Sequence, residues 1–410
     1  MQLTYTTFTA HLSSALTQKN GLELAYLLSP REEHGKTILK EFRNPTPQSM
    51  TYYKGGMDAP WDDIAIHYVL VVNHIARNRP IDAFKEQCSL VSLFFRYFTT
   101  DTGWTLPALF SILRDLRDLA CDADLQAAQN GQGGTEHMEE SARVISRAFS
   151  NCVTDRISPY AESRKWGIYY VVGLILKSYF RIKRISLAKN ILRAIDANPD
   201  IPPLSAYPRS HQVTYRYYIG MLGFLNEDFA KSEQELTLAF YNCHTQARRN
   251  QERILTYLIP LRVLRGHLPS RELLNRFPVL DDLYSPFIEA IRKGDIASYD
   301  AALERMENRL IQLNLLLTVE KARELCIRSL FRKAWAVQGK GTRISISDFH
   351  TALTLSGADV PVEEAECLVA NMIFKGLMRG YISHEKQTVV LANTNAFPRV
   401  VDRPSPYAMV

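Results

Sequence analysis

Apolar residues return every three or four positions along most of this chain, and this helical period favours a fold built from packed helices. Stretches such as "DDIAIHYVLVVNHIARN" (62–78) and "KWGIYYVVGLILKSYFRI" (165–182) are each long enough for one helix. The period is interrupted at Arg79-Pro80, at 130–136, at 198–208 and around Pro269. The sequence therefore predicts many helices joined by short connections.

Helices with one apolar face must stack on their neighbours to bury it, and an internal repeat is a common way to do so. Within "YYIGMLGFLNEDFAKSEQELTLAF", Gly220, Phe229, Leu236 and Ala239 have the spacing of a tetratricopeptide-type helical hairpin. Two further sets fit this frame, the second more loosely: Leu176, Ile185, Ala188, Leu192 and Ile195, then Val72, Ile81, Phe84 and Val91. We expect an α-solenoid of such hairpins over residues 62–317.

The first 61 residues precede this body. Residues 1–30 predict a short helical segment. The stretch Phe42–Trp61 collects proline, glycine and polar residues that sustain neither helix nor strand. We expect a linker or a surface loop there.

The pattern changes after residue 340. Ile344–Ile346 predicts a short strand, and Ser347 is the expected N-cap of a helix that closes at Gly357. A second helix begins after Pro361, and "RGYISHEKQTVVLA" (379–392) predicts a β-hairpin. This order predicts a winged helix over 342–394, joined to the body by a long helix over 318–341 and followed by a tail over 395–410.

Basic residues gather in the long helix, although the net charge of the chain is only +6. Between Lys321 and Arg343 there are seven basic residues against one acid, Glu324. At 100° per residue, Arg328 and Arg332 share one stripe with Lys321, and Trp335 lies at its edge. Such a row suits a phosphate backbone and a stacked base, while a solvated helix face is the alternative.

The predicted winged helix favours contact through its wing. Its second helix begins with Glu363, Glu364 and Glu366, which would repel phosphates where base contacts are normally made. We therefore expect sequence-independent backbone contact by the wing, with the helix itself packed on a partner subunit. The candidate nucleic-acid-binding residues are Lys321, Arg328, Arg332, Lys340, Arg343, Lys375, Arg379, His384 and Lys386.

A second basic group lies in the solenoid, on a predicted helix and the turn before it. It contains no acid and consists of Arg181, Lys183, Arg184, Lys189 and Arg193. These side chains are candidates for binding an acidic partner, and simple solvation is the alternative.

Motifs of catalysis and of metal binding are absent from the sequence. It has no GxxxxGK[ST], GxGxxG after a strand, HExxH or GxSxG, and His67 and His74 alone do not make a metal site. The six cysteines are scattered singly inside apolar helical stretches, and we expect them to be reduced core residues of an intracellular protein. No signal peptide or membrane-spanning run is evident. We expect a soluble cytosolic or nuclear protein that is not an enzyme and has no cofactor.

A helical-repeat body that leads through one long helix into a winged helix resembles the PCI-domain proteins. These are scaffold subunits of the proteasome lid, the COP-nine signalosome and translation initiation factor three. Four stretches resemble one branch, the PCI-domain-containing protein two family, whose fungal members are also named as a twelfth signalosome subunit. They are 162–196, 213–244, 253–270 and 366–398, the last reading "ECLVANMIFKGLMRGYISHEKQTVVLANTNAFP".

The resemblance implies a subunit of the nuclear transcription-and-export complex two. In that complex the family's members pair with a larger PCI subunit and a small, acidic, mostly disordered protein found also in the proteasome lid. The paired winged helices form a platform for RNA or DNA that couples transcription to messenger export at the nuclear pore. The alternative is a protein-only structural subunit of a signalosome or proteasome-lid type of assembly.

Overall fold

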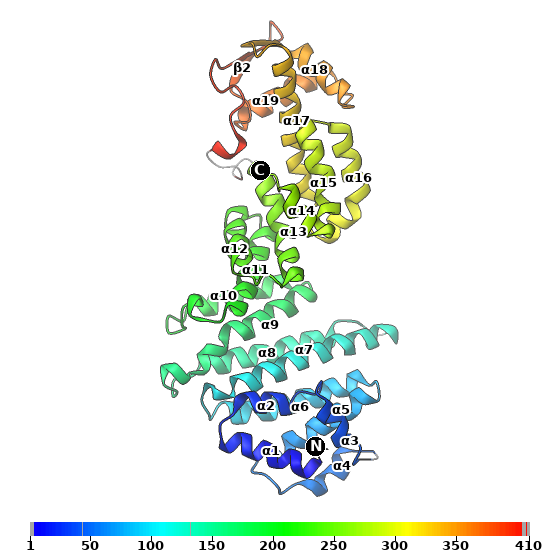
Figure 1. Ribbon diagram of the computed structural model, residues 1–410, viewed down its shortest axis with the longest axis vertical. Coiled ribbons are helices and arrows are strands. Elements are labelled where there is room, and N and C mark those ends of the chain that lie inside the picture. Colours follow the sequence, from blue (N-terminus) through cyan, green and yellow to red (C-terminus); the bar gives the residue numbers. More distant parts are fainter. Residues whose placement is uncertain (1–3, 43, 132, 404–406, 408–410) are drawn as a thin grey trace. The chain divides into compact units, whose positions relative to one another are not determined.

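The structure, a computed structural model, describes residues 4–42, 44–131, 133–403 and 407 (Figure 1). It is mostly helical and ends in one small sheet, which confirms the fold class predicted from the sequence. Two compact units are distinguished, Met1–Tyr218 and Ile219–Val410. The division falls within helix α11 (Arg209–Leu225).

The first unit consists of helices, several of which pack against the next helix along the chain. They are α1 (Tyr5–Thr17), α2 (Gly21–Leu27), α3 (Glu33–Leu39), α4 (Pro47–Met50), α5 (Trp61–Ala76), α6 (Pro80–Phe98), α7 (Leu106–Gln129), α8 (Glu136–Val153), α9 (Ile168–Arg181) and α10 (Ala188–Asp196). Aromatic side chains fill the core between them. Phe8 of α1 stacks on Tyr68 of α5 with ring centroids 5.1 Å apart, and both are fully buried.

The predicted loop Phe42–Trp61 contains more structure than its composition suggests. Thr46 and Ser49 form a capping box that starts the one-turn helix α4, and Met50 at its end is fully buried. Trp61 opens helix α5 and is itself buried. The expectation of a segment without helix was therefore wrong, because a local cap and two apolar anchors hold it on the body.

A buried ion pair fixes the connection between α8 and α9. The Asp155 carboxylate accepts hydrogen bonds from the backbone N–H of Arg164 at 2.8 Å and from the hydroxyl of Ser163 at 3.0 Å. The Arg164 guanidinium lies 3.4 Å from Asp155 and donates to the carbonyl of Phe98 at 2.9 Å. These bonds tie a long irregular connection to the end of α6.

The second unit continues with helices stacked in the same manner. They are α12 (Phe229–Asn242), α13 (Arg248–Leu264), α14 (Arg271–Arg276), α15 (Pro278–Lys293), α16 (Ile296–Gln312) and α17 (Leu316–Val337). The small residue predicted at a helix crossing is in place, since a Cβ on Gly220 would lie 2.6 Å from Cγ of Leu236. Phe229, Leu236 and Ala239 are buried, as the repeat pattern predicts.

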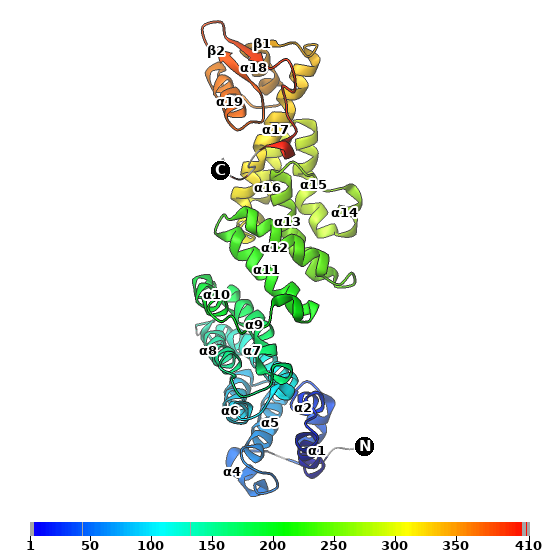
Figure 2. The ribbon, with the colours of Figure 1, turned by 90° about the vertical axis from the view of Figure 1, so that its left-hand side faces the viewer.

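Helix α17 leads into a winged helix, visible beside the labels β1 and β2 in Figure 2. Its elements are β1 (Arg343–Ser345), α18 (Ile346–Leu355), α19 (Val362–Phe374), β2 (Gly380–Ser383) and β3 (Thr388–Leu391). The antiparallel sheet has the order β1-β3-β2. Ser345, not Ser347 as predicted, caps α18, because the strand ends one residue earlier than expected. The hydroxyl of Ser345 accepts a hydrogen bond from the N–H of Ser347.

The inner face of the sheet closes the small domain. Ile344, Val389 and Ile382 are directly opposite one another on the three strands, and Val389 and Leu391 are buried. Phe349 of α18 packs on Phe331 of α17 with ring centroids 4.8 Å apart. These apolar side chains therefore close the small domain.

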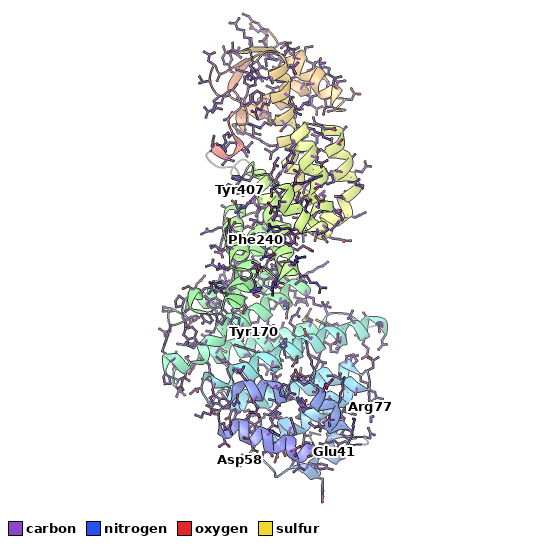
Figure 3. All side chains as sticks on the ribbon, in the orientation of Figure 1. Glu41, Asp58, Arg77, Tyr170, Phe240 and Tyr407 are labelled. Atoms are coloured by element: carbon purple, nitrogen blue, oxygen red, sulfur yellow. The ribbon has the colours of Figure 1, made fainter. Side chains whose placement is uncertain are left out.

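The described part of the tail, residues 395–403 and Tyr407, returns along the second unit and is named here the C-terminal strap. The carbonyl of Ala396 accepts from the N–H of Arg379, and Val400 lies against Gly266. Tyr407, labelled in Figure 3, donates its hydroxyl to Glu233 at 3.2 Å and to the carbonyl of Leu261 at 3.1 Å. The strap thus connects the winged helix with helices α12 and α13.

Candidate nucleic-acid and partner surfaces

The outer face of the small sheet presents a cation beside an aromatic ring. Arg343 on β1, Val390 on β3 and Tyr381 on β2 lie opposite one another in the register. Arg343 is exposed, and Tyr381 is 63% exposed. Arg379, directly before β2, is exposed as well. The sheet and the residue that precedes β2 therefore offer two exposed guanidinium groups and one accessible ring.

Two lysines extend this surface. Lys340 lies in the turn before β1, and Lys386 lies in the turn between β2 and β3. We call Lys340, Arg343, Arg379, Tyr381 and Lys386 the wing face. Within the part of the chain that the structure describes, none of its four cations has an ion pair or a side-chain hydrogen bond. Their charges are therefore available to an anionic ligand.

Three of the predicted nucleic-acid-binding side chains are already paired. Lys321 lies 3.7 Å from Glu227 and sits over the ring of Phe229. Lys375 forms an ion pair with Glu324. Pairing with a carboxylate removes most of the attraction that either lysine would exert on phosphate.

His384 is the third paired side chain. Its Nδ1 lies 2.8 Å from Glu366, and this hydrogen bond lowers the pKa of the Glu366 carboxyl below its ordinary value. Gln387 donates to the other oxygen of the same carboxylate at 3.3 Å. Glu366, predicted to repel phosphates from the groove-reading position, is therefore engaged in holding the wing tip.

Arg328 does not lie on an exposed stripe, contrary to the expectation from the helical period. Its side chain is buried, with 8% of the residue exposed, and Nη2 donates to the carbonyl of Pro398 at 2.6 Å. Trp335 donates Nε1–H to the carbonyl of Gly341 at 2.9 Å and packs on Phe397. The strap covers both residues, while Arg332, one turn from Arg328, is exposed.

Helix α19 exposes a stripe that is only partly polar. Glu363, Cys367, Ala370 and Phe374 follow one another at helical spacing and are all exposed, Phe374 to 75%. Cys367 was expected to be a core residue, and its exposure corrects that expectation. An accessible phenylalanine on a stripe with acids at its start suits a protein partner better than a phosphate backbone.

The basic group predicted to meet an acidic partner is assembled at the α9–α10 connection. Arg181 ends α9, Lys183 and Arg184 occupy the turn, and Lys189 and Arg193 lie one turn apart on α10. All five are exposed. Arg184 lies 2.9 Å from Glu139, so one of the five charges is already paired.

An apolar hollow of about 240 Å³ lies where α12, α13 and α14 meet. Phe240, which is labelled in Figure 3, contributes to its wall with Leu255, Leu258 and Ile259. Arg262 reaches it while lying 3.7 Å from Glu233. The hollow could accept an apolar side chain of a partner segment.

Sequence reasoning missed the exposed rings of Tyr381 and Phe374. The alternation along β2 is the signal for Tyr381, because Ile382 faces inward and its neighbour must face outward. Phe374 ends a helix in which the buried residues are Ala365, Val369 and Met372, so helical spacing puts it on the other side.

Neither a membrane span nor a metal site is found among the residues that the structure describes. In the described ranges of the chain, no helix is both long and apolar enough to cross a bilayer. Across those same residues, no group of three or more His, Cys, Asp or Glu side chains is arranged to hold a metal ion.

Comparison with known proteins identifies the family. Residues 300–393, which cover α17 and the winged helix, match the PCI domain. Protein CSN12 homolog of Schizosaccharomyces pombe is 37% identical over 95% of this chain and 96% of its own length. The CSN12 homolog of Neurospora crassa is 33% identical over 94% and 97%, and PCI domain-containing protein 2 of Xenopus laevis 29% over 97% and 98%. The chain therefore belongs to the CSN12 homolog and PCI domain-containing protein 2 family.

Proposed function

We propose that this protein is a non-enzymatic scaffold subunit of a nuclear messenger-export complex, located at the periphery of the nuclear pore. In this proposal it pairs with a larger PCI subunit and a small acidic protein, and it contributes a sequence-independent surface for RNA or DNA. Membership of the family supports the scaffold role. The wing face supports the nucleic-acid role.

The unpaired charge of the wing face is the observation that carries the proposal. Four exposed cations lie on or next to the strands of the sheet that carries the accessible Tyr381, and none of them is neutralised within the described residues. Cations release counterions from a phosphate backbone, and an aromatic face stacks on any base. Neither interaction reads a base edge, so binding is expected to be insensitive to sequence.

Two other surfaces support protein partners. The stripe of α19 that ends at Phe374 suits another folded subunit, because a large exposed aromatic side chain is stabilised by burial. The basic group at the α9–α10 connection of the first unit suits an acidic partner segment. The apolar hollow beside α13 in the second unit suits an apolar side chain of a partner.

A protein-only role is the second candidate function. The exposed stripe of α19 favours this role, since it can bind another protein without nucleic acid. The name CSN12 homolog, which two relatives carry, is consistent with a subunit of a signalosome type of assembly. In that case the wing-face cations would be solvated, as exposed charges usually are.

The test is binding of a labelled single-stranded RNA by the full chain, measured by fluorescence anisotropy at several salt concentrations. Charge reversal by Arg379→Glu together with Lys386→Glu should weaken binding by at least tenfold at low salt. The matched control is Arg305→Glu with Arg309→Glu, which reverses two exposed charges on α16. Equal loss in both double variants, or none in either, would leave the protein-only role.

A further inference from the structure

Arg328 is a buried cation whose contacts do not account for its charge. Its only hydrogen bond is to a neutral carbonyl, that of Pro398, and its Nε has no hydrogen-bond partner in the described part of the chain. Burial and the neighbouring Arg332 and Arg403 lower the pKa of Arg328 to about 10, so it still carries its charge at neutral pH. A buried guanidinium without a counter-charge is unfavourable, so an anionic ligand would stabilise Arg328.

The group that covers Arg328 also covers an aromatic ring. Phe397 of the strap packs on Trp335 with ring centroids 5.4 Å apart and planes 39° apart. The next residue, Pro398, supplies the oxygen that Arg328 binds at 2.6 Å. The strap therefore places one ring on an α17 tryptophan and one oxygen on an α17 arginine, using two consecutive residues.

This pair of contacts has the chemistry of a bound nucleotide. In single-stranded nucleic-acid sites a base stacks on an aromatic side chain while a phosphate oxygen binds a guanidinium. Phe397 stands where the base would lie, and the carbonyl oxygen of Pro398 stands where the phosphate oxygen would lie. A phosphodiester would bring the negative charge that the carbonyl lacks.

We propose that the C-terminal strap is an autoinhibitory cover, which occupies a nucleotide-binding site formed by Arg328 and Trp335 and is displaced by single-stranded nucleic acid. The proposal rests on the function proposed above and adds a second site to the wing face. Arg332, exposed one turn along the helix, would take the neighbouring phosphate. Anchors further along the strap, Val400 on Gly266 and Tyr407 on Glu233, can hold it while residues 396–398 move aside.

The test compares the full chain with Phe397→Ala, Arg328→Met and the double variant in binding a labelled single-stranded oligoadenylate. Phe397→Ala frees the Trp335 ring and loosens the cover, so binding should tighten by roughly tenfold, the effect of one stacked base. Arg328→Met should leave the affinity of the covered chain within about twofold and should abolish most of the gain in the Phe397→Ala background.

Two outcomes would overturn the cover. One is unchanged or weaker binding by a folded Phe397→Ala variant, and the other is an Arg328→Met loss as large in the covered chain as in the opened one. If Phe397→Ala leaves binding unchanged while Arg379→Glu weakens it, the autoinhibitory cover is excluded but the proposed nucleic-acid function stands. If no variant binds the oligoadenylate, the proposed nucleic-acid function fails as well.

Hydrogen exchange on the unaltered chain gives a second measurement that needs no substitution. Saturating oligoadenylate should accelerate exchange of the Ala396 and Phe397 amides, because both residues are buried while the strap lies on α17. Slower or unchanged exchange in that segment would show that the strap stays in place and would overturn the proposal.

Discussion

Tyr381 and Arg343 are separated by one residue across the sheet, and their removal should produce different signatures in RNA binding. Tyr381 offers a stacking surface that is 63% exposed, whereas Arg343 offers an unpaired charge. Stacking does not depend on salt, but phosphate contact does. Substituting each by alanine therefore separates the two interactions within one small surface.

The expected magnitudes differ in kind. Loss of one stacked base costs about 1–3 kcal/mol, so Tyr381→Ala should weaken binding by roughly 5- to 150-fold at every salt concentration. Loss of one phosphate contact lowers the slope of log affinity against log salt by about 0.7. When salt is raised from about 50 to about 200 mM, the fold-loss of affinity should therefore be about 2.6 times smaller for Arg343→Ala than for the parent chain.

Fluorescence anisotropy over that salt range measures both quantities. Both side chains project from the outer face of the sheet, so thermal unfolding should change little in either variant. Separate stacking and phosphate contacts are excluded if Tyr381→Ala changes the salt slope as much as Arg343→Ala does. Contact of RNA with this face is excluded if neither folded variant binds more weakly than the parent.

Three further predictions concern the body and the exposed face of α19. Asp155→Asn leaves the buried Arg164 without its counter-charge, so the free energy of unfolding measured with urea should fall by about 3–5 kcal/mol. The hydrogen bonds to Asp155 hold the pKa of its carboxyl below its usual range. The stabilisation that ionised Asp155 gives the fold is therefore present above about pH 4 and is lost as pH falls through the folded pKa. Asp155→Asn should not show this pH-dependent loss of stability. Gly220→Ala should destabilise by about 1–3 kcal/mol, measured in the same way, because its Cβ would collide with Leu236. Cys367 should react fastest with a thiol reagent in mass spectrometry, and a partner that covers α19 should slow that reaction.

The helical period was enough to predict the body, since burial of one face is a local property of sequence. Gly220 and Leu236 illustrate this, because a small residue opposite a large one is needed wherever two helices cross closely. The strand, helix, helix and hairpin order of the winged helix was predicted for the same reason. Turn residues and alternating apolar residues specify it within about fifty residues of sequence.

Contacts made by distant segments could not be predicted in this way. The helical wheel puts Arg328 and Arg332 on one side of α17 but does not indicate which part of that side another segment covers. Pro398, seventy residues later, covers Arg328 and leaves Arg332 exposed. Lys375 likewise looked free in the sequence, but its partner Glu324 is 51 residues away. Charge clusters read from sequence therefore need the fold before their free members are known.

Photo-crosslinking reports where nucleic acid lies on the unaltered chain. A 4-thiouridine-containing single-stranded RNA would be bound to the full chain and irradiated, and the adducts would be located by mass spectrometry. We expect the main adduct in the peptide that contains Tyr381, with salt reducing its yield. Adducts confined to the first unit, or none above the level of a protein without the wing face, would show that the wing face does not bind RNA.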